Sequence, residues 1–94
     1  MSEKKVREDA ERNRYVVSVD GEDAGSAYYQ VRDGVVVFTH TEVEDRWEGQ
    51  GVGSALVRSA LDDVVGSGRK FAPHCPFVAA WVDKHPDYAD SAVD

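Results

Sequence analysis

Residues 48–65 read EGQGVGSALVRSALDDVV, and they join a loop with three alternating glycines to an amphipathic segment. Apolar residues recur from Val52 onward at intervals of three and four, which predicts a helix with one buried face. Gly66 and Gly68 are expected to end that helix. Because glycine costs backbone entropy in any ordered segment, three of them before a helix require a reason. The two candidate reasons are a tight turn and a ligand that touches the backbone.

The residues on either side of this stretch predict four strands and a second helix. The strands are expected at 14–19, 24–31, 35–43 and 69–73. Asp33-Gly34 between two apolar runs is a strong hairpin signal. The second helix is expected at 75–85, with Pro76 in its first turn. The order β-β-β-α-β-α predicts an α+β domain with a mostly antiparallel mixed sheet and two main helices.

Length, composition and charge limit the classes of protein that this chain can belong to. With 94 residues, the chain predicts a single domain over 1–94, in which the highly polar residues 1–12 form a frayed arm or a short first strand. The formal net charge is −7, which disfavours binding to nucleic acid or to an anionic membrane. Cys75 is the single cysteine, so no internal disulfide is expected. No stretch predicts a membrane span, and we expect a cytoplasmic protein.

A strand, a glycine loop and a helix N-terminus together form an arrangement that can bind phosphate. The N–H groups of a first helical turn are free, and the aligned peptide dipoles place partial positive charge there. Glycines allow a pyrophosphate to approach the backbone without meeting a Cβ. The spacing matches neither the dinucleotide-binding fingerprint nor the Walker loop. On glycine spacing alone, phosphate binding and a ligand-free turn are equal alternatives.

Three motifs together resemble the small branch of the GNAT acyltransferase superfamily, over about residues 12–90. They are FTHTEV at 38–43, EGQGVGSALV at 48–57 and CPFVAAWVDKHPDY at 75–88. The resemblance implies that acetyl-CoA is bound as acyl donor, with its pyrophosphate on the glycine loop. The implied cofactor-binding residues are Val43, Glu48, Gly49, Gln50, Gly51, Val52, Gly53 and Ser54. The resemblance also implies that Glu42 and Val43 pair with the pantetheine arm like an added strand. Glu48 departs from the superfamily pattern, which has Gln or Arg at that place.

Three residues are candidates for the chemistry of acyl transfer to an amine. His40 and Glu42 alternate on strand 35–43, so both are expected on one face, where they could deprotonate an amine. The alternative is a hydrogen-bonded core histidine and a solvated carboxylate. Cys75 is expected at the N-terminus of the second helix, a position that favours a thiolate, although a free cysteine is more often a small buried hydrophobe. The resemblance implies that Cys75 lies near the cofactor's sulfur, as an acyl carrier or as a pocket wall. It also places Trp81 where many members have a tyrosine that protonates the departing thiolate, which an indole cannot do.

These observations support three hypotheses of function. The first is an acetyl-CoA-dependent N-acyltransferase that acts on an unidentified amine, either a small molecule or a protein amine. The second is a module that binds acetyl-CoA or CoA without efficient turnover. The third is a redox-sensing thiol protein built on Cys75. The histidines and the cysteine lack the spacing of metal ligands, so no metal is expected. An open sheet edge is compatible with a homodimer.

Overall fold

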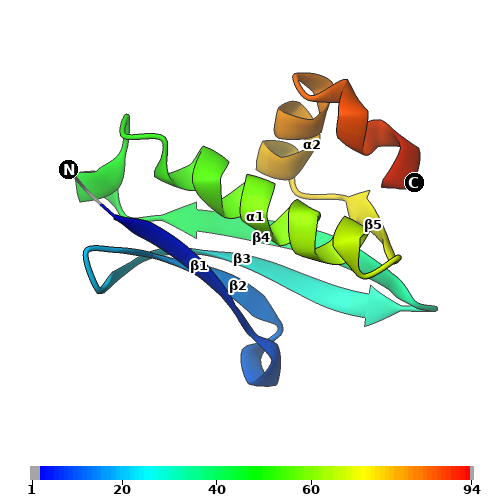
Figure 1. Cartoon of the computed structure of the whole chain (residues 1–94), viewed down its shortest axis with the longest axis horizontal. Helices are drawn as coiled ribbons and strands as arrows, with labels where there is room; N and C mark the ends of the chain where they lie inside the picture. Colours follow the sequence, from blue (N-terminus) through cyan, green and yellow to red (C-terminus); the bar gives the residue numbers. More distant parts are fainter. Residues whose placement is uncertain (1–2, 94) are drawn as a thin grey trace.

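The computed structural model describes residues 3–93, which form a five-stranded sheet with helix α1 lying across one of its faces (Figure 1). The strands are β1 (Lys4–Asp9), β2 (Arg14–Val19), β3 (Glu22–Arg32), β4 (Val35–Val43) and β5 (Lys70–Pro73). The helices are α1 (Val52–Gly66) and α2 (Pro76–Asp83), with 3₁₀ turns η1 (Ala10–Arg12), η2 (Asp45–Trp47) and η3 (Pro86–Ser91). The first four strands are antiparallel neighbours in chain order, and β5 runs parallel to β4. The α+β class is therefore confirmed.

The structure corrects the predicted element order at the N-terminus. Of the two alternatives for residues 1–12, the short first strand is confirmed and the frayed arm is wrong, because residues 4–9 form β1. Four strands therefore precede α1, and the order with three strands is wrong. Met1 and Ser2 lie outside the described residues. β1 pairs with β2 along its full length, from Lys4 opposite Val19 to Asp9 opposite Arg14. Backbone pairing of this kind needs few apolar side chains at a sheet edge, and Val6 alone packs against the core.

The core lies between α1, α2 and the facing side of the sheet. The buried residues of α1 are Val52, Leu56, Val57, Ala60, Leu61 and Val64, as the helical period predicts. Phe38 of β4 and Phe71 of β5 meet them from the sheet, with their ring centroids 6.5 Å apart. Within residues 3–93, no helix has both the length and the apolar character to cross a membrane.

Two core tyrosines reach carboxylates at the edge of the core. Tyr15 Oη donates to Asp63 at 2.6 Å, and Tyr29 Oη donates to Glu8. Burial, reinforced by the hydrogen bond to Asp63, raises the pKa of Tyr15. Burial and the hydrogen bond to Glu8 raise the pKa of Tyr29 to about 12.

We expect the free energy of unfolding to fall as the pH rises from about 10 to about 12. An unfolded tyrosine loses its proton near pH 10, whereas the folded Tyr29 keeps its proton to about 12, so the contribution is complete below pH 10 and is lost above it. Urea unfolding of the wild type and of Tyr29→Phe, at pH 8 and at pH 11, measures the effect. The variant should lose less stability over this interval, and an equally steep loss would contradict the assignment.

Candidate functional site

The end of β4 leaves part of a strand edge without a neighbouring strand. β5 pairs with β4 only over Val35–Phe38, and it ends at Pro73, which has no N–H to continue the ladder. The N–H of Cys75 donates to the Phe38 carbonyl at 2.8 Å, and the chain then turns into α2. Residues 40–43 consequently pair with β3 alone. Backbone groups on their other edge are available to an extended ligand.

A β-bulge at Thr39 decides which face of the sheet each β4 side chain beyond it points to. β3 pairs Tyr29 with Phe38 but pairs Tyr28 with His40, so Thr39 is the extra residue in β4. Phe38 faces the core. Beyond the bulge, Thr41 lies on the core face and His40 lies on the outer face. A regular strand would have put His40 on the same face as Phe38.

His40 and Glu42 share the outer face of β4, as the alternation predicts. His40 Nε2 lies 3.0 Å from Glu42 Oε1, and the two side chains are 59% and 64% exposed. The His40 ring stacks on Tyr28, with centroids 6.1 Å apart. The alternative of a core histidine is therefore wrong, and the pair is open to solvent.

Cys75 lies on the other side of β4 from this pair. It immediately precedes α2, as predicted, and it is 3% exposed. Its Sγ is 3.3 Å from the Oγ1 of Thr41, which points to the core face. The three predicted catalytic side chains thus form two separate groups: His40 with Glu42 outside, and Cys75 with Thr41 inside.

The glycine loop ends at a helix start with unpaired amides. Gly49 and Gly51 have φ values of 79° and 74°, in the left-handed region that favours glycine. The first backbone bond of α1 runs from the N–H of Ala55 to the Gly51 carbonyl at 3.0 Å. The N–H groups of residues 52–54 precede this bond, and within residues 3–93 they donate to no backbone carbonyl. The helix start therefore offers donors to an anion.

Gly53 is in close contact with Phe77, which the sequence pattern does not reveal. A Cβ at Gly53 would lie 2.6 Å from Cζ of Phe77, so the Phe77 ring rests directly on the first turn of α1. Phe77 remains 45% exposed, although it is apolar. The two residues are far apart in the sequence, and no motif predicts their contact.

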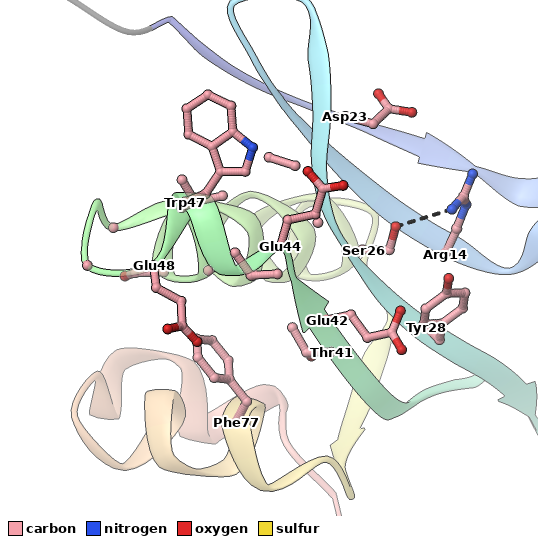
Figure 2. Close-up of a pocket in the computed structure, with 18 residues that line it drawn as sticks. Arg14, Asp23, Ser26, Tyr28, Thr41, Glu42, Glu44, Trp47, Glu48 and Phe77 are labelled. Atoms are coloured by element: carbon pink, nitrogen blue, oxygen red, sulfur yellow. Dashed lines mark hydrogen bonds between the residues drawn. The ribbon is translucent and has the colours of Figure 1, made fainter.

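The glycine loop, Phe77 and the end of β4 line one cavity of about 920 Å³. Of the predicted catalytic residues, Glu42 lines it, whereas His40 and Cys75 do not. In Figure 2, Thr41 and Phe77 lie on one side of β4, and Glu42 and Tyr28 lie on the other. Of the predicted cofactor-binding residues, those that line the cavity are Val43, Glu48, Gly49, Gly51, Val52, Gly53 and Ser54. Gln50 does not, and its side-chain amide donates to the Arg46 carbonyl at 3.3 Å. The cavity therefore brings the glycine loop and the open strand edge together.

The cavity wall carries more acidic than basic side chains. Its carboxylates are Asp23, Glu42, Glu44 and Glu48, and its basic side chain is Arg14. Asp23 is paired with Arg7 at 3.1 Å and Glu44 with Arg46 at 3.4 Å. Glu48 forms no ion pair within the described part of the chain. An anion bound here would depend on the backbone amides and not on cationic side chains.

Trp81 belongs to the core and does not line the cavity. It is 6% exposed and stacks on His85, with ring centroids 3.8 Å apart. Its indole N–H donates to Ser54 Oγ, in the first turn of α1, at 3.0 Å. The expectation that Trp81 supplies no proton to a leaving group agrees with this placement.

Comparison with known proteins agrees with the fold and with the motifs. A family model described as GCN5-related N-acetyltransferase matches residues 14–91. Protein NATD1 of Gallus gallus is 31% identical over 83 residues, which cover 86% of this chain and 76% of that protein. Protein NATD1 of Homo sapiens is 31% identical over 84 residues, which cover 87% and 74%. The solution NMR structure of a GCN5-like protein from Staphylococcus aureus shares the fold, with a TM-score of 0.71 at 21% identity over 95% of this chain and 87% of that chain. The chain belongs to the GCN5-related N-acetyltransferase family.

Proposed function

We propose that the protein is an N-acyltransferase with acetyl-CoA as acyl donor and an amine as acceptor. The observation that supports this most is one cavity that joins unpaired amides at the start of α1 to the unpaired edge of residues 40–43. Acetyl-CoA carries an anionic diphosphate on a linear chain with two amide groups. The helix start suits the diphosphate, and the strand edge suits the amides. Bound there, acetyl-CoA supplies an acetyl group activated as a thioester.

The residues on the core side of β4 then hold the donor. The amides of residues 49–54 bind the diphosphate, and the edge at Glu42 and Val43 pairs with the pantetheine amides. Thr41 lines the inner end of this side, and Cys75 packs behind it. Because Cys75 is 3% exposed, bonded to Thr41 and outside the cavity lining, we assign it a packing role behind Thr41 and not that of an acyl carrier. The same burial disfavours a redox-sensing role, which needs an accessible thiol.

The residues on the outer face of β4 take up the proton that the acceptor amine loses. When the Nε2–H of His40 donates to Glu42, Nδ1 is free to take a proton from the acceptor's ammonium group. Glu42 then stabilises the positive charge on the ring. Trp81 offers no proton, because its N–H is bonded to Ser54. Protonation of the departing thiolate is therefore left to solvent in the open cavity.

Thermal unfolding with acetyl-CoA, followed by a turnover assay, tests this function. Acetyl-CoA at a few hundred micromolar should raise the melting temperature by several degrees if its concentration is about 100 times the dissociation constant. Thiol release should then depend on an added amine, and His40→Gln should slow it without changing affinity for acetyl-CoA. No stabilisation by acetyl-CoA would overturn the proposal.

A second candidate is a CoA-binding domain without efficient turnover. It is favoured by Trp81, which stands at the sequence position of the family's proton-donating tyrosine but is buried, bonded to Ser54 and outside the cavity lining. Stabilisation by acetyl-CoA without amine-dependent thiol release, over a panel of small amines and lysine peptides, would select this candidate.

Glu48→Gln is expected to strengthen CoA binding about three- to tenfold. Glu48 lines the cavity beside the proposed diphosphate site, and a unit charge about 6 Å from another costs about 0.7 kcal/mol in water. Titration calorimetry at low salt measures the gain, which should shrink at high salt. Glu11→Gln, at an exposed position in η1, removes the same charge outside the cavity and should change little. Equal affinities for both variants would count against the placement of the diphosphate.

A further inference from the structure

We propose that Trp81 is a positioning residue of the donor site. Its indole N–H fixes the hydroxyl of Ser54, so that the hydroxyl proton is presented to the diphosphate. This inference rests on the proposed function, since it adds a side-chain donor to the backbone amides already assigned.

The indole of Trp81 is held firmly enough to fix a partner. Its ring stacks on His85 at 3.8 Å with an interplanar angle of 11°. Tyr88 contacts it edge-on at 4.9 Å, and the Arg58 guanidinium lies over it at 5.3 Å. Tyr88 is itself tied to α1, because its hydroxyl donates to Asp62 at 2.5 Å. The indole N–H therefore has one well-defined direction.

The chemistry of the two groups decides which atom donates. An indole N–H is only a donor, so Ser54 Oγ must be the acceptor in the 3.0 Å bond. A hydroxyl has one proton of its own, and this bond leaves that proton unused. Within residues 3–93 the Ser54 hydroxyl donates to no acceptor.

The position of Ser54 allows its free hydroxyl proton to be donated to an anion in the cavity. Ser54 is the third residue of α1, is exposed, and lines the cavity. It lies in the same turn as the unpaired N–H groups of residues 52–54. Hydrogen bonds to charged acceptors are the stronger ones, so a phosphate oxygen suits this proton better than water does. Trp81 thus acts on the ligand through Ser54, without touching the ligand itself.

A double-mutant cycle on CoA affinity tests the proposal. Ser54→Ala and Trp81→Phe should each weaken CoA binding about five- to tenfold. The double variant should bind no more weakly than Ser54→Ala, because Trp81 acts only through that hydroxyl. Effects that multiply in the double variant would overturn the proposal and leave Trp81 with a purely structural role. Ser59→Ala, at an exposed position of α1 outside the cavity, is the matched control and should keep full affinity.

A second measurement does not depend on the stability of Trp81→Phe. Displacement of a labelled CoA analogue measures the affinity of an unlabelled competitor. Ser54→Ala should lower the affinity for CoA. It should leave the affinity for pantetheine unchanged, because pantetheine lacks the diphosphate. Unchanged CoA affinity in Ser54→Ala overturns this inference alone, provided that the wild type binds CoA. A wild type that binds no CoA overturns the proposed function and this inference together.

Discussion

Gly51→Asp is expected to weaken CoA binding at least about 100-fold. Gly51 is the N-cap of α1, and its backbone is in the left-handed region at a φ of 74°. An aspartate here places a negative charge at the N-terminus of α1, beside the N–H groups proposed for the diphosphate, and that charge repels the anion. A Cβ at this position also makes the left-handed conformation of the loop unfavourable. Titration calorimetry at moderate salt measures the loss.

Gly68→Asp is the matched control for this prediction. Gly68 has a φ of 79°, an added Cβ there meets nothing within 4 Å, and it lies just beyond the opposite end of α1. The two variants therefore share the added charge and a similar backbone strain of about 1 kcal/mol. Gly68→Asp should bind CoA like the wild type. If Gly51→Asp binds equally well, the diphosphate does not lie on the glycine loop.

Phe38→Ala is expected to lower the free energy of unfolding by about 3–5 kcal/mol. Phe38 is 1% exposed, and its ring meets those of Tyr15, Tyr29 and Phe71 at centroid distances of 6.3, 6.2 and 6.5 Å. The total stability of a domain of this size is on the order of 5–14 kcal/mol, so one such cavity removes a large part of it. Urea unfolding followed by far-UV circular dichroism measures the change.

Val31→Ala provides the comparison for the core variant. Val31 is also an apolar strand residue, but it is 56% exposed, so its truncation should change the stability by about 0.5 kcal/mol or less. Similar losses in the two variants would mean that the core is not centred on the aromatic cluster.

Elements with a clear local pattern could be predicted from the sequence. The apolar period of residues 52–65 predicted α1, and Asp33-Gly34 predicted a tight hairpin, in which both residues have positive φ values of 52° and 78°. β1 was harder to predict, because KKVRED has a single apolar residue and is held by pairing with β2. The second helix ends at Asp83, two residues earlier than predicted, since the N–H of Lys84 already turns back to the Trp81 carbonyl.

The site could be predicted only where it depends on local sequence. Strand alternation correctly put His40 and Glu42 on one face, but it could not show which face, because the bulge arises from pairing with β3. The contact of Gly53 with Phe77 and the bond of Ser54 with Trp81 join residues of different helices. Such contacts follow from the packing of α1 against α2, which no single segment encodes.

The bulge has a consequence for insertions and deletions in β4. Parallel pairing with β5 stops at Phe38, and the extra residue, Thr39, comes next. Deleting Thr39 would leave His40 and Glu42 outside and Thr41 inside, because the remaining residues alternate regularly from Phe38. The deletion would, however, remove the bend that a bulge imposes on its strand. Loss of the extra residue therefore does not decide which β4 side chains are buried; the bulge sets the bend of the strand beside the cavity, and that bend is what a one-residue deletion would change.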